Sequence, residues 1–228
     1  MKKINLSILF LSLCMAVMAQ HKEVRNLSSF SKLEVSRAVK VYIEKGSSEK
    51  ARIEVSGLDL EDIKTEVSGS TLIIGIHKHK KYLRNVDVTV YLTYKNLRDI
   101  EVNSAASLYT KGTLKSDKLN IQVSSAAKAE LDISVSDLDI DISSAGHLEL
   151  EGNADFQEIS VSSAGSYNGY DLDCKTSDVY VSSAGSAKIV ALNKLKAKAS
   201  SAGSIKYKGD PKNTNVHANS GGSIKKMN

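Results

Sequence analysis

The chain has 228 residues, of which 41% are hydrophobic and 25% charged, with one proline and no tryptophan. This composition is typical of a single globular domain and excludes a disordered chain or one embedded in a membrane. The formal net charge of +5 becomes +3 without Lys2 and Lys3, which belong to the leader described next. So mild a charge gives no reason to expect a nucleic-acid partner.

Residues 1–19 have the three parts of a secretory signal peptide. Lys2 and Lys3 form a basic start, residues 4–13 are apolar, and residues 17–19 are suited to cleavage after Ala19. The mature chain, residues 20–228, is therefore expected in the periplasm, at the cell surface or secreted, with no transmembrane segment. Cys14 raises the alternative of a lipoprotein, but Leu13 stands where lipidation needs a small residue.

Cys174 is the only thiol that remains after this cleavage, so no internal disulfide can form. A catalytic cysteine would need a histidine close by, and no local motif supplies one. We interpret Cys174 as a small residue of the core.

Residues 20–100 predict a β-rich N-terminal region. Residues 33–35 and 39–46 resemble residues 100–102 and 108–112, which indicates a degenerate first coil. Alternating apolar residues at 51–55, 71–76 and 86–92 predict longer strands. We expect these strands to cap the first coil, because an open solenoid end needs cover.

Residues 101–228 repeat one short phrase seven times, as in Ile142-Ser-Ser-Ala-Gly146. The copies recur at intervals of about 19 residues, with a polar return such as residues 115–118 or 210–213 between them. We therefore predict an all-β fold, a right-handed β-helix or β-solenoid of about seven coils, with residues 20–228 as one structural unit.

Side chains alternate between the two faces of a strand, and this period predicts which residues of the phrase point inward. The alternation assigns the second serine and the glycine of each copy to the interior, where they would shape a corner. We expect each buried hydroxyl to bond to the next coil. This structural ladder comprises Ser104, Ser125, Ser144, Ser163, Ser183, Ser201 and Ser220, with Gly146, Gly165, Gly185, Gly203 and Gly222.

The same period places the first serine and the alanine outside, as a smooth strip of small side chains of about 400 Å². Such an area supports only a weak contact, since a stable interface needs about 800 Å² from each partner. The strip is either a flat corner without a partner or a docking face for another copy or an extended ligand. It comprises Ser143, Ala145, Ser162, Ala164, Ser166, Ser182, Ala184, Ser186, Ser200, Ala202 and Ser204.

Three segments carry a resemblance to a known family: Phe30-Ser-Lys-Leu-Glu-Val35, Ile63-Lys-Thr-Glu-Val67 and Val86-Asp-Val-Thr-Val90. Followed by the Val-Ser-Ser-Ala-Gly-Ser coils, they resemble the head GIN domain family of auto-transporter adhesins over nearly all of the mature chain. The resemblance implies an exported bacterial protein, as in Bacteroidetes, with a right-handed β-helix. It brings no catalytic residues.

Other chemical candidates are weak. His77 and His79 share a strand face, but two ligands do not close a metal site and the neighbouring lysines repel a cation, so a solvated basic loop is the preferred interpretation. Asp137, Asp139 and Asp141 alternate along one strand, yet they lack a glycine-rich calcium loop and read as a charged solvent face. We therefore expect no metal, no cofactor and no catalytic residue.

These observations favour a non-enzymatic exported envelope protein, an adhesin-like binding or structural module that contacts a glycan or a protein or associates weakly with itself. An envelope accessory protein that binds another protein is the first alternative. A β-helix enzyme acting on polysaccharides is the second, but such enzymes need clustered acids and bases where this chain has serine and alanine.

Overall fold

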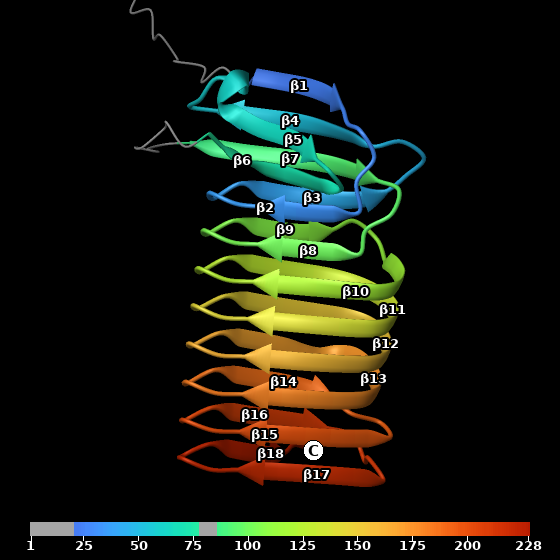
Figure 1. The fold of residues 1–228 in the computed structure, drawn as a ribbon, viewed down its shortest axis with the longest axis vertical. Helices are drawn as coiled ribbons and strands as arrows, with labels where there is room; N and C mark the ends of the chain where they lie inside the picture. The colour runs from blue at the N-terminus through green and yellow to red at the C-terminus, as the bar shows by residue number, and fades with distance from the viewer. Residues whose placement is uncertain (1–20, 78–85) are drawn as a thin grey trace, which may run out of the picture.

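The computed structural model describes residues 21–77 and 86–228, which form one 18-stranded sheet wound into a solenoid (Figure 1). Residues 1–19, for which the sequence predicts a signal peptide, and the three lysines between residues 78 and 81 lie outside these residues. The only helical turn described is the 3-10 turn η1, Leu60–Asp62. None of the helices described could cross a membrane. The expected all-β solenoid is therefore confirmed.

The coils are flattened into two layers, which we call the front face and the rear face as they lie in Figure 1. The strands of the front face are β2 (Lys32–Val35), β5 (Ile63–Ser68), β6 (Thr71–Ile76), β8 (Asp99–Val102), β10 (Leu114–Val123), β15 (Lys194–Ala199) and β17 (Asn213–Ala218). Those of the rear face are β1 (His21–Asn26), β3 (Lys40–Lys45), β4 (Lys50–Ser56), β7 (Asp87–Tyr94), β9 (Ser107–Thr110), β14 (Ser186–Val190), β16 (Ser204–Lys208) and β18 (Ser223–Lys226). Three long strands, β11 (Lys128–Ile142), β12 (His147–Val161) and β13 (Ser166–Val181), start in the rear face and bend into the front face.

Each coil turns at two edges. At the turn edge the chain reverses tightly through the repeated phrase, and at the arc edge it bends more broadly from the rear face to the front (Figure 1). Successive coils pair in parallel and in register, as in the column Ile121, Ile140, Ile159 and Val179. Because side chains of like shape then stack between coils, the apolar positions of every repeat form continuous columns.

The turn edge corrects our interpretation of the repeated phrase. The second serine and the alanine do not alternate along a strand but form the two central residues of a tight turn, with φ of 49° at Ser144 and 60° at Ala145. The Gly146 N–H closes this turn by donating to the Ser143 carbonyl over 2.8 Å. Both central residues are exposed in every copy, so the predicted inward position is wrong for Ser104, Ser125, Ser144, Ser163, Ser183, Ser201 and Ser220. Only the glycine prediction holds, with Gly146, Gly165, Gly185 and Gly203 buried and Gly222 half-buried in the last coil.

A ladder does run along the turn edge, but it consists of backbone groups. The Ala126 N–H donates to the Ser144 carbonyl of the next coil over 3.0 Å, and the Ala145 N–H repeats this bond to Ser163 over 3.0 Å. The series begins one coil before the first copy of the phrase, where Arg37 and Ala38 adopt the same left-handed angles and the Ala38 N–H donates to the Ser104 carbonyl. Residues 37 and 38 thus form a turn of the same kind as the repeated phrase.

Five of the seven copies of the phrase end in glycine, and at Gly146 this residue allows a close approach between coils. A Cβ added at Gly146 would lie 2.8 Å from the carbonyl carbon of Val123 in the preceding coil and closer still to its oxygen. Real Cβ atoms do not approach backbone so closely. Glycine at this position thus leaves room for the backbone of the preceding coil. The left-handed angles of the turn belong to the serine and the alanine before it.

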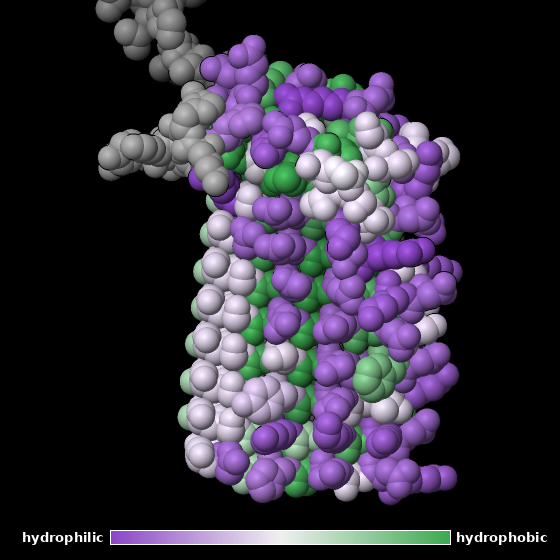
Figure 2. Space-filling view, in the orientation of Figure 1, coloured by the Kyte–Doolittle hydropathy of each residue, from purple (hydrophilic) through white to green (hydrophobic). Residues whose placement is uncertain are grey.

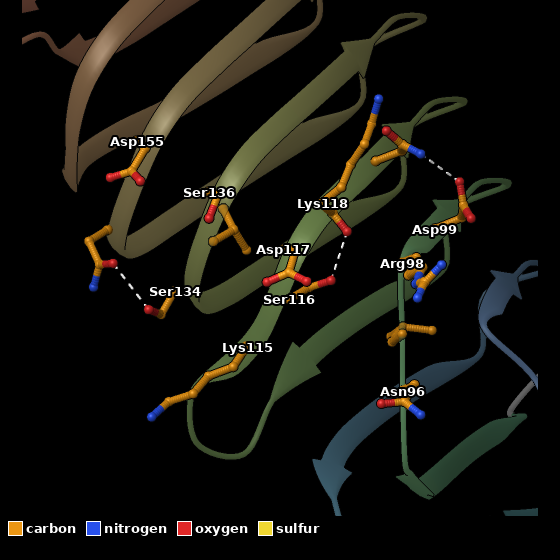
Figure 3. A pocket seen from close by; sticks show the side chains of 14 residues that line it. Asn96, Arg98, Asp99, Lys115, Ser116, Asp117, Lys118, Ser134, Ser136 and Asp155 are labelled. Atoms are coloured by element: carbon orange, nitrogen blue, oxygen red, sulfur yellow. Dashed lines mark hydrogen bonds between the residues drawn. The ribbon is translucent and has the colours of Figure 1, made fainter.

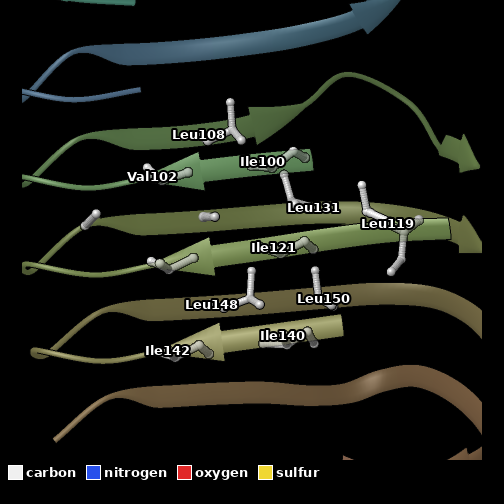
Figure 4. Packing of buried hydrophobic residues seen from close by; sticks show 14 of the residues in the cluster. Ile100, Val102, Leu108, Leu119, Ile121, Leu131, Ile140, Ile142, Leu148 and Leu150 are labelled. Atoms are coloured by element: carbon white, nitrogen blue, oxygen red, sulfur yellow. The ribbon is translucent and has the colours of Figure 1, made fainter. Parts of the chain in front are cut away.

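The core lies between the two faces and is almost wholly aliphatic. Ile121 and Ile140 of the front face and Leu131 and Leu148 of the rear face point toward one another (Figure 4). All four are at most 2% exposed. Burial of such side chains stabilises the fold by about 1.5–3 kcal/mol each.

A polar cluster interrupts this core near the arc edge. Gln157 and Ser177 are buried, and the Gln157 amide donates to the Ser177 hydroxyl over 2.8 Å. The Tyr167 hydroxyl donates to the Gln157 Oε1 over 3.1 Å, and Ser177 donates to the Val190 carbonyl over 3.3 Å. The cluster satisfies its own hydrogen bonds, as buried polar groups require.

The N-terminal strands cap the first coil. Strand β4 pairs with β7 and with β1, and β5 pairs with β6, all antiparallel, which ends the parallel stack. The predicted cap is therefore present. At the opposite end lie β17 and β18, and every residue of β17 is exposed.

Candidate functional site: a polar groove at the arc edge

The arc edge is hollowed where the long strands bend. Val135 and Ala154 point inward at the bends of β11 and β12, while the serines, asparagines and aspartates beside them point outward. The connection from β7 to β8 crosses next to these bends and completes the wall (Figure 3). The bends therefore present polar side chains on a backbone fixed by the stacked coils.

The resulting groove, which we call the arc groove, has a volume of about 770 Å³. It is lined by Asn96, Leu97, Arg98, Asp99, Lys115, Ser116, Asp117, Lys118, Asn120, Ser134, Val135, Ser136, Asn153 and Asp155. Three basic and three acidic side chains balance formally in this lining. Its volume lies within the range of small-molecule sites, about 300–1,000 Å³.

Hydrogen bonds fix several of the lining side chains. The Asn120 amide donates to Asp99 over 2.7 Å, and the Ser134 hydroxyl donates to the Oδ1 of Asn153 over 3.1 Å. Ser116 donates to the Lys118 carbonyl over 2.7 Å (Figure 3). Such internal bonds hold a polar site in place before a ligand arrives.

The groups that face the groove can donate and accept hydrogen bonds together. The Asn153 Oδ1 already accepts a bond, which leaves its Nδ2 amide to donate, while the Arg98 guanidinium adds donors. Asp117 and Ser136 supply acceptors. A ligand with many hydroxyl groups matches this mixture better than an apolar or a strongly charged one.

The carboxylates of the groove are partly neutralised by lysines. Asp155 pairs with Lys175 over 2.7 Å, and Asp99 lies 3.6 Å from Lys32. Across residues 21–77 and 86–228 there is no cluster of three or more His, Cys, Asp or Glu side chains that could hold a metal ion. Asp137, Asp139 and Asp141 are exposed on the front face, in keeping with the predicted charged surface.

The strip predicted from the repeat lies along the turn edge. Ala145, Ala164, Ala184 and Ala202 are exposed, and the serines on either side of each turn are half-buried. Figure 2 shows this edge as a smooth pale band beside the hydrophilic front face. The most exposed residues of this edge are the two central residues of each turn, the second serine and the alanine, and a binding role for the strip stays a prediction.

Two other sequence candidates have different outcomes. Of the two histidines, His79 lies outside the described residues, and the His77 backbone N–H donates to the Asp62 carbonyl over 2.9 Å. Cys174 is fully buried, which raises the pKa of its thiol and confirms the interpretation as a core residue.

Sequence reasoning missed the arc groove. The sequence predicts residues 115–118 only as a polar return between coils, and it gives no prediction for residues 96–98. The groove joins four segments that are separated in the chain, residues 96–99, 115–120, 134–136 and 153–155, so its one local signal is the change in sequence between coils at the bends.

Residues 29–211 match the family described as "Putative auto-transporter adhesin, head GIN domain". The chain belongs to this family. A comparison with functionally curated proteins gave no match.

Solved structures confirm the fold. The chain is similar to a putative adhesin from Bacteroides fragilis, with 20% identity, a TM-score of 0.82, and coverage of 92% of this chain and 97% of the other. A putative adhesin from Parabacteroides merdae has 17% identity and a TM-score of 0.74, covering 92% and 96%. A protein from Parabacteroides distasonis named as a putative lipid binding protein has 20% identity and a TM-score of 0.71, covering 92% and 97%.

Proposed function

We propose that this member of the head GIN family is a non-catalytic, adhesin-like binding module of the cell envelope that holds a glycan in the arc groove. The observation that carries the proposal is the lining of the groove, which is polar, close to neutral and partly fixed by its own hydrogen bonds. Sugar hydroxyls both donate and accept, so they suit amides and carboxylates that converge on one cavity. The adhesin description of the family supports the same function.

The groove favours a neutral glycan over the other ligand classes. A polyanion would meet Asp99, Asp117 and Asp155, which offset the three basic side chains. An acyl chain would bury the polar lining without replacing its hydrogen bonds to water, which costs free energy. The name of the lipid-binding relative therefore does not carry over to this groove.

A glycan array with the mature protein tests the proposal. We expect binding of a neutral oligosaccharide, and we expect the triple variant Arg98→Ala, Asp117→Ala, Asn153→Ala to lose at least about tenfold in affinity, because each lost hydrogen bond contributes about 0.5–1.5 kcal/mol. Absence of any bound glycan, or binding that the triple variant leaves unchanged, would contradict it.

A matched control is the double variant Ala164→Glu, Ala184→Glu on the turn edge. It should keep both the circular dichroism spectrum and the glycan affinity, because these side chains are exposed and lie on the other edge. If this variant lost glycan binding and the groove variant did not, the strip and not the arc groove would hold the glycan.

The enzyme alternative is tested on the same glycans. Glycoside hydrolysis needs two carboxyl groups placed on either side of the bond that breaks. Two of the three acids in the groove lie beside lysines, so we expect binding without turnover. Release of reducing ends that disappears in Asp117→Asn would overturn this part of the proposal.

We also propose that the protein is exported and that cleavage after Ala19 produces a mature chain starting at Gln20. N-terminal sequencing of protein recovered from envelope and medium fractions tests this. A chain that still begins at Met1 in those fractions would contradict it.

A further inference from the structure

The charges of the solenoid are segregated along its axis. Residues 128–185 contain twelve carboxylates and two lysines, whereas residues 186–228 contain nine lysines and one carboxylate. The two blocks therefore carry formal net charges of −10 and +8, which the small net charge of the whole chain conceals. Two regions of strong and opposite charge on one molecule favour contact with a surface that carries the complementary charges.

On the rear face this segregation follows a single column of outward side chains. Strand pairing places one residue from each coil in register, about 4.8 Å apart. In order along the axis the column reads Tyr109, Glu130, Glu149, Asn168, Lys188, Lys206 and Lys225. The carboxylates and the lysines thus lie on opposite sides of Asn168.

The three lysines of this column form a ladder of like charge. Lys188, Lys206 and Lys225 are exposed, and within the described part of the chain none of them makes an ion pair. Lys188 lies over the Tyr170 ring, 5.8 Å from its centroid. Like charges directly opposite one another on neighbouring strands are destabilising. Carboxylates of another molecule would therefore stabilise the ladder.

The carboxylates of the column line a groove of their own. This groove has a volume of about 240 Å³. Its charged walls are Glu130, Asp132, Glu149, Glu151 and Asp171. Among the described residues, no lysine or arginine lines it. Lys128 beside it pairs with Glu130, and the Asn168 amide donates to Glu149 over 3.1 Å. The five carboxylates still outnumber these partners, so a cationic side chain from another molecule would find acceptors there.

We propose that the rear face is a self-complementary interface through which two copies of this chain form an antiparallel dimer. A two-fold axis parallel to the strands, at the level of Asn168, exchanges the coils above and below that residue. It places Lys188 against Glu149 of the second copy and Lys206 against Glu130 of the second copy. Lys225 then faces Tyr109 of the second copy, where a cation–π contact is favourable. Each contact occurs twice, as in any isologous interface.

The pattern favours a second copy over a soluble polyanion. The lysine ladder spans three coils, about 10 Å, and Glu149 and Glu130 follow one and two coils beyond Asn168. A longer polyanion would be repelled by these acids, whereas a second copy satisfies the acids and the lysines together. The matching rows cover about 500 Å² on each copy, so we expect a weak dimer that salt disrupts.

Sedimentation velocity with charge-swap variants tests the dimer. The wild type should dimerise at protein concentrations between about 10 µM and 1 mM in about 0.05 M salt, and dissociate in about 0.5 M salt. Lys188→Glu with Lys206→Glu should weaken the dimer at least about tenfold, since like charges then face each other. Glu130→Lys with Glu149→Lys should do the same.

The two double variants mixed in equal amounts should form a heterodimer, because every facing pair is then of opposite charge. This recovery also shows that both variants are folded. The control, Lys194→Glu with Lys198→Glu, makes the same charge change on the exposed front face and should leave the wild-type dimerisation unchanged.

Three results would overturn the proposal: a wild type that stays monomeric at about 1 mM in low salt, a mixture that does not recover, or loss of the dimer in the front-face control. A monomer that binds dextran sulfate through Lys188 and Lys206 would show that the ladder serves a polyanion instead.

Discussion

At the turn edge, successive coils reverse through the same two residues in left-handed conformation, and one backbone hydrogen bond joins each turn to the next. At the arc edge the outward side chains differ from coil to coil, from Ser134 and Ser136 in one bend to Asn153 and Asp155 in the next. The repeated edge offers a flat surface of small side chains, and the varied edge contains the arc groove. Repetition in this chain therefore marks the scaffold, and departures from it mark the candidate site.

Substitution of a turn-edge glycine should have the largest effect. Gly146→Ala brings a Cβ against the backbone of Val123 and is expected to lower the free energy of unfolding by about 2–3 kcal/mol, measured by urea denaturation. Ala127→Gly, at the same place in the preceding turn, is the control and should cost about 1 kcal/mol or less. Equal effects of the two changes would show that coil clearance does not determine the use of glycine.

Alkaline pH should destabilise the protein through its interior near the arc edge. Burial raises the pKa of Cys174 and of Tyr167, and that of Tyr94 to about 12. Above the ordinary pKa values of these groups, near 8.5 and 10, the unfolded chain loses protons that the folded chain retains, so the free energy of unfolding falls as pH rises. Urea denaturation between about pH 7 and pH 10 measures this fall. Cys174→Ala should make the fall less steep near the ordinary pKa of a thiol. If the pH dependence of this variant equals that of the wild type, Cys174 does not contribute to the fall.

Relief of the left-handed strain at one turn should have a smaller and opposite effect. Ala164 has φ of 60°, which costs about 1–2 kcal/mol in an alanine. Ala164→Gly removes this cost and adds entropy to the unfolded chain, so we expect a net stabilisation of about 0.5 kcal/mol in thermal melts. Ala164→Val, which is β-branched, should destabilise instead, and a stabilising valine would refute the turn geometry.

Changes in the arc groove should have the smallest effect on stability. Asn153→Ala removes an exposed side chain that accepts one hydrogen bond from Ser134, and we expect a change within about 0.5 kcal/mol in the free energy of unfolding. Ser136→Ala, a neighbouring exposed position, serves as the comparison. A loss of more than about 2 kcal/mol at either position would make the groove part of the scaffold and remove the contrast between the edges.

The repeat predicted the solenoid and its apolar columns because both follow from period-two alternation and a constant coil length. It did not predict the turn, since Ser-Ser-Ala-Gly lacks the Asn-Gly pair that usually indicates two consecutive left-handed residues. Only the last copy, Asn219-Ser-Gly-Gly222, hints at it. Extension of the strand alternation through the phrase therefore placed Ser144 and its counterparts inside.

The arc groove could not be predicted either, and the reason differs from that for the turn. Arg98, Asp117 and Asn153 lie in separate coils, and their proximity depends on how far each bend protrudes. No local pattern encodes that distance. The charged column of the rear face was within reach of the sequence, because a correct coil length aligns Glu149 with Lys188 on either side of Asn168.

The buried polar cluster has a consequence for how nearly identical coils find their proper neighbours. Leu138, Gln157, Ser177 and Leu195 occupy one inward column, so the amide and hydroxyl of the middle pair face leucines on either side. A chain that skipped a coil during folding would set Gln157 beside Leu195 in place of Ser177 and leave buried polar atoms without partners, at about 1–3 kcal/mol each. One glutamine and one serine thus favour the native pairing of coils over a pairing shifted by one coil, which the apolar columns alone would tolerate.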